Sequence, residues 1–247
     1  RKGSGKKPSG KKQQAKKQRR RIIIFVIEII ILVIAVFVLY ATMSASKSGK
    51  VKIDDDDIII NDTVKKAEET TMKGYRNIAL FGVDSTSGAL TKSTRSDTIM
   101  IASINQDTGE CKLVSVYRDT YLNLSNDTYN KCNAAYAKGG PEMAISMLNM
   151  NLDMNITDFV TVGFAGLTDT IDALGGVYID VDDSEINHLN NYQLCIAEDL
   201  KRSYTPVSST GYQLLDGLQA TGYCRIRYTA GDDFKRAERQ REVLSAV

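Results

Sequence analysis

The 247-residue chain has room for two small domains at most, and its 43% hydrophobic and 25% charged residues are typical of a globular protein. The net charge of +2 conceals an uneven distribution, because eleven of the 32 basic residues and no acidic residue lie in the first 21 positions. The remainder is acidic, with 21 basic against 30 acidic residues. A basic tail can bind nucleic acid, but one directly before an apolar run is more typical of a topogenic signal that contacts anionic lipid, so we expect no nucleic-acid partner.

Residues 1–21 therefore predict a disordered cytoplasmic tail, and residues 22–42 predict a transmembrane helix. The apolar run from Ile22 to Tyr40 is interrupted only by Glu28, and at about 1.5 Å per residue it spans roughly 28 Å, close to the hydrocarbon thickness of a bilayer. A cleaved signal peptide remains the alternative, because small residues follow at 44–46.

The positive-inside rule keeps the amino terminus in the cytoplasm and places the rest of the chain outside the cell membrane, as a single-pass protein. Residues 43–75 are expected to form an extracytoplasmic stalk, and residues 76–247 one catalytic domain. Since the chain does not begin with Met and ends inside a helical pattern, we expect a fragment truncated at its carboxyl terminus.

Short apolar runs and helical patterns alternate along this domain. The pattern predicts helices that begin near Pro141 and cover 167–174 and 215–222, followed by a last helix around 236–240. It predicts strands at 78–83, 98–104, 112–116, 159–164 and 177–181. The alternation favours an α/β fold, a three-layer sandwich with a mixed central sheet, preceded by the one N-terminal transmembrane helix.

The four cysteines have no C-x-x-C spacing, and His188 is the single histidine, which argues against a zinc site. An extracytoplasmic domain permits disulfides without requiring them, and lone cysteines are more often packed as small hydrophobic residues. Pairing among them stays open. The cysteines are Cys111, Cys132, Cys195 and Cys224.

Arginines and carboxylates stand at the ends of several apolar runs. Arg95 and Asp97 share one face if the strand begins there, and so do Arg225 and Arg227 if that segment is extended. Each such pair alone is typical of a solvated surface. Their combination in an acidic domain suits a diphosphate held by guanidinium groups and a divalent metal. The same set includes Asp84, Arg118, Asp119 and the helical stripe Arg236, Arg239 and Gln240.

Six ordered motifs over residues 75–247 resemble the LytR-CpsA-Psr family of cell-wall enzymes in Gram-positive bacteria. The motifs are NIALFGVD (77–84), RSDTIM (95–100), YRDT (117–120), KCNAAY (131–136), DALGGV (172–177) and RAERQ (236–240). Cys132 is unusual within its motif, and Lys235 stands where many members have glycine.

The resemblance implies transfer of a phosphate-linked glycopolymer, such as wall teichoic acid or capsule, from an undecaprenyl-diphosphate carrier to a peptidoglycan sugar hydroxyl, with lipid monophosphate leaving. It implies Mg²⁺ or Mn²⁺ held by Asp84 and Asp97. It implies catalytic roles for Asp97, Arg118 and Asp119, with either aspartate orienting or deprotonating the acceptor. The implied diphosphate-binding residues are Arg95, Arg118, Arg225, Arg227, Arg236, Arg239 and Gln240.

Two other functions remain open. One is a non-catalytic membrane sensor or transcriptional attenuator that binds lipid-linked polymer, and the other is a hydrolase in which water replaces the sugar hydroxyl. For the lipid end we expect either an apolar groove or plain core at Met143, Met147, Leu148, Leu152, Leu167 and Ile171.

Overall fold

The computed structural model describes residues 49, 51, 53–67, 70, 72–85, 90 and 93–247. The chain divides into two units, residues 1–52 and 53–247, and the described helices and strands all belong to the second. The predicted tail (1–21) and transmembrane helix (22–42) lie outside the described residues. No helix within the described ranges is both long and apolar enough to cross a bilayer.

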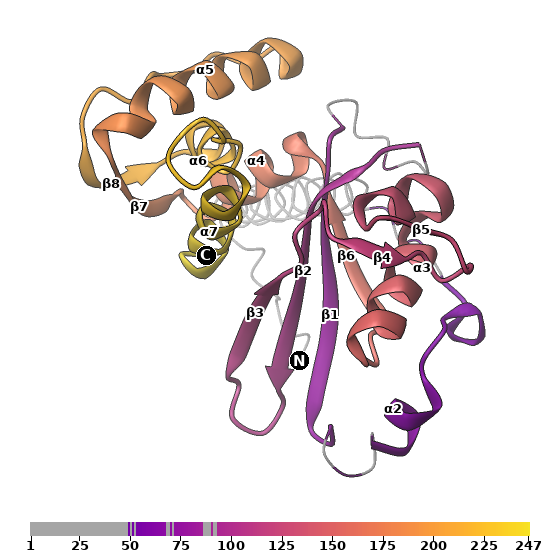
Figure 1. Cartoon of the computed structure of the whole chain (residues 1–247). Coiled ribbons are helices and arrows are strands. Elements are labelled where there is room, and N and C mark those ends of the chain that lie inside the picture. Colours follow the sequence, from indigo (N-terminus) through magenta and orange to yellow (C-terminus); the bar gives the residue numbers. More distant parts are fainter. Residues whose placement is uncertain are drawn as a thin grey trace, which may run out of the picture. The chain divides into compact units, whose positions relative to one another are not determined.

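Five strands, β1 to β5, follow one another, and from α3 to α6 helices and strands alternate as predicted (Figure 1). The strands are β1 (Tyr75–Val83), β2 (Ser96–Asn105), β3 (Cys111–Ser115), β4 (Tyr121–Asn123), β5 (Tyr129–Lys131), β6 (Asp158–Val162), β7 (Val177–Val181) and β8 (Gly211–Leu215). The helices are the 3₁₀ turn η1 (Asp55–Asp57) and α2 (Asp62–Ala67), α3 (Asn133–Leu152), α4 (Phe164–Ala173), α5 (Asp183–Leu200), α6 (Gly217–Tyr223) and α7 (Asp232–Ser245).

The largest sheet has the strand order β3-β2-β1-β6. β1 pairs antiparallel with β2, with Phe81 opposite Ile99, and parallel with β6, with Leu80 opposite Val160. The prediction of an α/β fold with a mixed central sheet is therefore confirmed. Two separate ribbons, β4-β5 and β7-β8, accompany this sheet.

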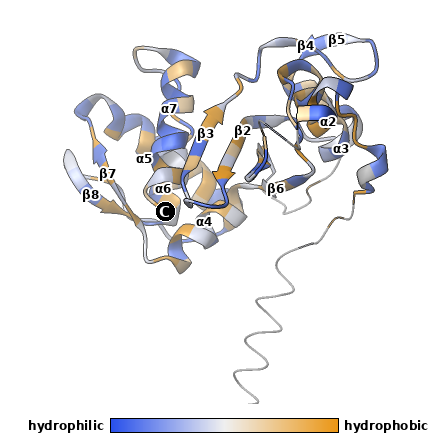
Figure 2. Cartoon of the chain, turned by 90° about the horizontal axis from the view of Figure 1, so that it is seen from below, coloured by the Kyte–Doolittle hydropathy of each residue, from blue (hydrophilic) through white to orange (hydrophobic). Residues whose placement is uncertain are grey.

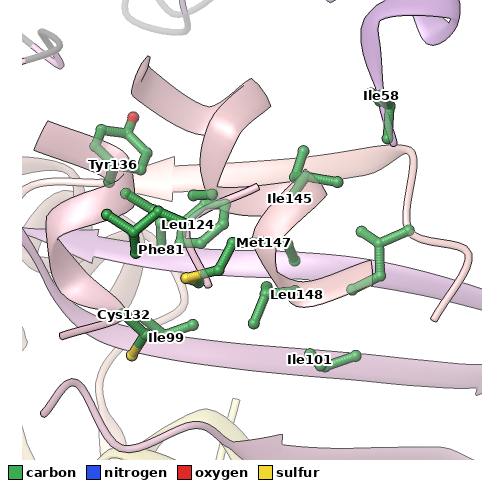
Figure 3. Packing of buried hydrophobic residues seen from close by; sticks show 14 of the residues in the cluster. Ile58, Phe81, Ile99, Ile101, Leu124, Cys132, Tyr136, Ile145, Met147 and Leu148 are labelled. Carbon is green, nitrogen blue, oxygen red and sulfur yellow. The ribbon is translucent and has the colours of Figure 1, made fainter. Parts of the chain in front are cut away.

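The first hydrophobic core lies between this sheet and α3 (Figure 3). Alternate residues of β1, Ala79, Phe81 and Val83, point into it and are buried. Helix α3 covers them with Met147 and Leu148, which are fully buried. Burying one such large apolar side chain stabilises the folded state by about 1.5–3 kcal/mol compared with leaving it in water. The packing of α3 on the sheet therefore fixes the position of the sheet ends.

Helix α3 contains the start predicted at Pro141. Gly140 adopts a non-helical conformation with φ 72° and divides the element in two. Pro141 thus begins the second segment, where its missing N–H costs nothing because the first N–H groups of a helix have no intrahelical partner.

A second core gathers β7, β8 and helices α4 to α7 around Ile179, Leu189 and Ile226. Figure 2 shows that the ribbon of α5 and α7 is largely hydrophilic, as expected for helices that bury only one stripe. The third layer of the predicted sandwich, a helix layer on the other face of the central sheet, stays a prediction.

Two boundaries differ from the sequence-based expectation. Ile58, assigned to the stalk, is buried in the first core, and the Ile59 N–H donates to Ser146 Oγ at 3.1 Å, so the folded unit begins near residue 53 rather than 76. The segment with Arg225 and Arg227, which would share a face if extended, is a turn after α6 and not a strand, and the Arg225 N–H donates to the Gly222 carbonyl.

Candidate active site

Asp97 owes its position to an irregularity in the sheet. Thr98 pairs with Gly82 and Ser96 pairs with Val83, so Asp97 has no partner opposite it on β1. A bulge of this kind re-aims a side chain at the end of a ladder. Asp84 follows directly after β1, and both carboxylates line one cavity at this end of the sheet.

Three arginines converge on Asp97. Arg118 Nη1 donates to Oδ1 at 2.9 Å, and Arg227 Nη2 donates to Oδ2 at 3.2 Å. Arg236 Nη2 donates to the backbone carbonyl of Asp97 at 3.1 Å. These arginines come from the loop after β3, the turn after α6 and helix α7. The site therefore combines elements that pack around the first core with elements that pack around the second.

Asp233 occupies the centre of the same three guanidinium groups. Its carboxylate lies 3.7 Å from Arg118 Nε, 3.8 Å from Arg227 Nε and 3.3 Å from Arg236 Nη1. Burial lowers the pKa of Arg118, but the carboxylates of Asp97, Asp233 and Asp119 outweigh this and raise it overall. Burial also lowers the pKa of Arg236, as do Arg227 and Arg118.

Two of these arginines retain buried donors without a hydrogen bond. Within the described residues, Arg118 Nε and Arg236 Nε have no hydrogen-bond partner. A buried N–H that makes no bond costs about 1–3 kcal/mol, so such groups call for an explanation. Unbonded donors among several guanidinium groups suit an anionic ligand with many oxygens.

The cavity beside Asp84 and Asp97 has a volume of about 200 Å³. A second cavity of about 360 Å³, which holds Arg118 and Asp119, shares Asp97, Arg236 and Gln240 with the first. The first cavity has a polar and an apolar side. Its polar side chains include Asp84, Asp97, Arg225, Arg227, Arg236 and Gln240, and its apolar side includes Val83, Val162, Phe164, Leu167 and Tyr192.

Aromatic rings hold Arg225 against the wall of the first cavity. Its guanidinium carbon lies 4.3 Å from the Phe164 ring centroid and 5.2 Å from that of Tyr192. Such cation–π contacts contribute about 0.5–2 kcal/mol. Neither ring was predicted from the sequence, nor was Asp233, because nothing in their local sequence distinguishes them from core or helix-terminal residues.

Eight of the predicted site residues line the two cavities. They are Asp84, Asp97, Arg118, Asp119, Arg225, Arg227, Arg236 and Gln240. Arg95 is exposed and is not among the described residues that line either cavity.

Arg239 is also placed elsewhere. It is fully buried, its Nε donates to Glu185 Oε1 at 2.7 Å, and its other nitrogens donate to the Ile226 carbonyl and to Thr229 Oγ1. This placement does not support diphosphate binding by Arg239, because its guanidinium group is buried and all three nitrogens donate to protein acceptors. Its effect on the site is to hold the turn that carries Arg227.

Of the two alternatives for the residues considered for the lipid end, groove or plain core, most of these residues turn out to be core. Met147 and Leu148 of α3 are fully buried in the first core, and Ile171 is fully buried in the second. Met143 packs against the first core, and Leu152 is exposed. Of that predicted set, Leu167 lines the first cavity.

Asp84 and Asp97 fit the predicted metal role in part. No group of three or more His, Cys, Asp or Glu side chains that could hold a metal occurs in the described part of the chain. Mg²⁺ is commonly held by one or two carboxylates together with substrate phosphates and water. Two carboxylates that face one cavity meet that requirement.

All four cysteines are free. Cys132, the departure within the KCNAAY motif, is buried and donates its S–H to the Tyr117 carbonyl at 3.2 Å. Burial raises the pKa of the Cys132 thiol to about 11. It is therefore a packed, protonated residue rather than a nucleophile.

The chain is similar to bacterial cell-wall proteins. "Probable cell wall biosynthesis protein LcpB" of Corynebacterium glutamicum is 35% identical over 62% of this chain and 33% of its own length. "Polyisoprenyl-teichoic acid--peptidoglycan teichoic acid transferase TagU" of Enterococcus faecalis is 31% identical over 69% of this chain and 52% of its own. The chain thus spans a third to a half of the length of these relatives.

A solved structure described as a LytR-CPS2A-psr family protein, YwtF (TagT), with bound octaprenyl pyrophosphate lipid superposes with a TM-score of 0.55 and 26% identity. The superposition covers 81% of this chain and 67% of that one. The family model LytR_cpsA_psr matches residues 36–247. On this match, which includes the residues that build both cavities, the chain belongs to the LytR_cpsA_psr family.

Proposed function

We propose that this protein transfers a phosphate-linked glycopolymer from an undecaprenyl-diphosphate carrier to a peptidoglycan sugar hydroxyl, outside the cell membrane. The acceptor oxygen forms a bond to the phosphorus next to the polymer sugar. The bond from that phosphorus to the lipid-side bridging oxygen breaks, lipid monophosphate leaves, and the hydroxyl proton is released to solvent. A relative named as a teichoic acid transferase and a family structure with a bound polyisoprenyl pyrophosphate support the proposal.

The observation that carries the proposal is the convergence of Arg118, Arg227 and Arg236 on Asp97, with buried N–H donors left over. A diphosphate offers more oxygen acceptors than the Asp97 and Asp233 carboxylates use. Guanidinium groups already held in place stabilise charge that develops on a transferring phosphoryl group without rearranging. When the diphosphate binds, Asp233 would either move away from these arginines or stay beside them together with the diphosphate.

Asp84 and Asp97 would hold Mg²⁺ or Mn²⁺. The bound ion would neutralise phosphate charge during the transfer. The carboxylate of Asp97 also keeps Arg118 and Arg227 oriented toward the cavity. The apolar wall formed by Val162, Phe164 and Leu167 would receive the first part of the lipid.

Asp119 is suited to orienting the acceptor hydroxyl. The hydrogen bond from Lys131 lowers the pKa of its carboxyl, as does the charge of Arg118, while partial burial opposes the shift. A carboxylate with a lowered pKa is a weak proton acceptor at neutral pH but a good hydrogen-bond acceptor. We therefore favour orientation over deprotonation for this residue.

The test is release of lipid monophosphate from a synthetic lipid-diphosphate glycan, with Mg²⁺ and peptidoglycan oligomers, by the 247-residue chain and by Arg118→Ala. Loss of one preorganised donor should reduce transfer about 10²-fold or more. Arg76→Ala is the matched control, because Arg76 forms an exposed ion pair with Asp158 on the same sheet, and it should transfer normally.

The other functions give different results in the same assay. Cleavage of the donor without attachment to the oligomer would favour the hydrolase. Binding of the lipid diphosphate without any turnover would favour the sensor. Equal transfer by Arg118→Ala and by the unmodified chain would remove the arginine cluster from the mechanism.

A further inference from the structure

We propose that Tyr121 and Tyr129, exposed on the β4-β5 hairpin, form a subsite for the glycan strand that accepts the polymer. We refer to this pair as the tyrosine platform. The inference rests on the proposed transferase function, because it assigns that reaction's acceptor to a surface.

The hairpin register places the two rings together. Tyr121 lies opposite Lys131, and Tyr129 lies opposite Asn123, so the tyrosines are diagonal neighbours on one face. Their ring centroids are 5.9 Å apart with an interplanar angle of 27°. Both remain well exposed, at 69% and 58%. Burial therefore does not account for two large aromatic side chains at this place.

The surroundings of the platform suit a carbohydrate better than an apolar partner. A pyranose ring has an apolar C–H face and a rim of hydroxyl groups, so it pairs with an aromatic face flanked by polar side chains. Asn123 and Lys131, which lie opposite Tyr129 and Tyr121 in the hairpin register, are polar residues on the same face as the rings.

The platform is continuous with the reaction site. Lys131 Nζ, opposite Tyr121, lies 3.0 Å from Asp119 Oδ1. Asp119 Oδ2 lies 3.9 Å from Arg118 Nε, and both residues line the second cavity. A glycan strand on the rings would thus pass Lys131 and bring a sugar hydroxyl to Asp119, the residue we assign to orienting the acceptor.

A second stacked pair provides a matched control. Tyr178 and Tyr212 on the β7-β8 ribbon have ring centroids 5.3 Å apart at 19°, and both are exposed. Neither is among the described residues that line the two cavities. The two tyrosine pairs are therefore alike in residue type, stacking and exposure, but only the tyrosine platform lies next to the reaction site.

The chain contains no tryptophan, so one substituted tryptophan reports on its own position. We would titrate the 247-residue chain carrying Tyr121→Trp with soluble, un-cross-linked peptidoglycan glycan strands and record tryptophan emission. A saturable shift to shorter wavelength is expected, because a sugar that covers the ring removes water from it. The same titration of Tyr212→Trp should leave emission unchanged.

Acceptor kinetics give the second readout. Tyr121→Ala/Tyr129→Ala should raise the acceptor KM about tenfold, since it removes two stacking faces, and Tyr121→Phe/Tyr129→Phe should restore it. Tyr178→Ala/Tyr212→Ala should match the unmodified chain. Binding of the lipid diphosphate, measured separately, should be the same in all variants.

The outcomes separate this inference from the proposed function. No emission shift in Tyr121→Trp, with normal polymer transfer, overturns the subsite and leaves the transferase standing. Equal effects of the two alanine pairs on acceptor KM also overturn it. If the chain turns over no donor, the proposed function fails, and a saturable glycan shift confined to Tyr121→Trp would still support a glycan-binding surface there.

Discussion

At the scale of single residues, the site depends on side chains that restrain one another. Asp97 is the clearest case, because the β-bulge turns it toward the cavity while Arg118 and Arg227 each take one of its carboxylate oxygens. Neither arginine is free to rotate away without leaving a charge less well paired. Preorganisation of this kind is what transfer of a charged group requires.

The pair Lys131 and Asp119 gives a prediction on pH. Lys131→Met should raise the pKa of Asp119 toward its ordinary value of 3.8, because the hydrogen bond from Lys131 is the largest cause of the lowering. The pKa of the folded state lies below that of the unfolded state. The pair therefore stabilises the fold above the ordinary pKa and loses this contribution as pH falls through the folded pKa.

Carboxyl ¹³C NMR titration would measure the pKa directly, and urea unfolding at pH 7 and pH 3 would measure the linked stability. Because the Asp119 side chain is 44% exposed, the loss at pH 7 should stay below about 1 kcal/mol. An unchanged Asp119 titration in Lys131→Met would show that the ion pair does not form in solution.

At the scale of elements, a buried ion pair holds the turn after α6 and the start of α7 in place. Arg239 on α7 binds Glu185 near the start of α5 and the carbonyl of Ile226 in the turn. Glu185 also accepts the Asp182 N–H as part of the capping box of α5. One ion pair thus joins two helices and the turn that carries Arg227.

Arg239→Met should destabilise the fold by about 3–5 kcal/mol, because it leaves the Glu185 charge buried without its partner. Urea unfolding monitored by circular dichroism would measure this. Arg76→Ala, which removes a partner of an exposed pair, should shift the midpoint far less. The double variant Arg239→Met/Glu185→Gln should recover part of the lost stability. The buried carboxylate charge is then removed, and the glutamine side-chain oxygen can still accept the Asp182 N–H. A loss no greater than that of Arg76→Ala would contradict the assignment.

At the scale of the whole unit, the proposed diphosphate site lies where the two cores meet. Asp97 and Arg118 belong to the sheet with the first core, whereas Arg227 and Arg236 come with the second. Arg241 adds a further link by donating to Ser115 Oγ at 2.8 Å. An anion that bridges these arginines would bind the folded unit and not the unfolded chain.

Inorganic pyrophosphate should therefore raise the melting temperature. At about 100 times its Kd the stabilisation is about 2.7 kcal/mol, which corresponds to roughly 5–10 °C for a unit of this size. Differential scanning calorimetry would measure the rise, with sodium chloride of equal ionic strength as control. Arg118→Ala should lose most of the effect. An equal rise in that variant would show that the anion binds elsewhere.

The sequence alone determined five of the strands and the positions of several helices, because these rest on local periodicity and turn residues. Most predicted strands, the helix start at Pro141 and the end of α4 at Gly175 and Gly176, both with positive φ, agree with the structure. Eight of the predicted site residues also meet at the two cavities. Six of them stand in the ordered motifs, whereas Arg225 and Arg227 were grouped with them as a pair of arginines after a predicted helix.

Only the tertiary structure decided which charges face the cavity. Arg236 and Arg239 lie one turn apart on α7, yet the first lines both cavities and the second is buried against Glu185. Helical spacing assigns both to one stripe, and only the packing of α5 against this region separates them. Asp233 and Tyr121 were likewise indistinguishable in the sequence, because their roles depend on residues that folding brings from distant segments.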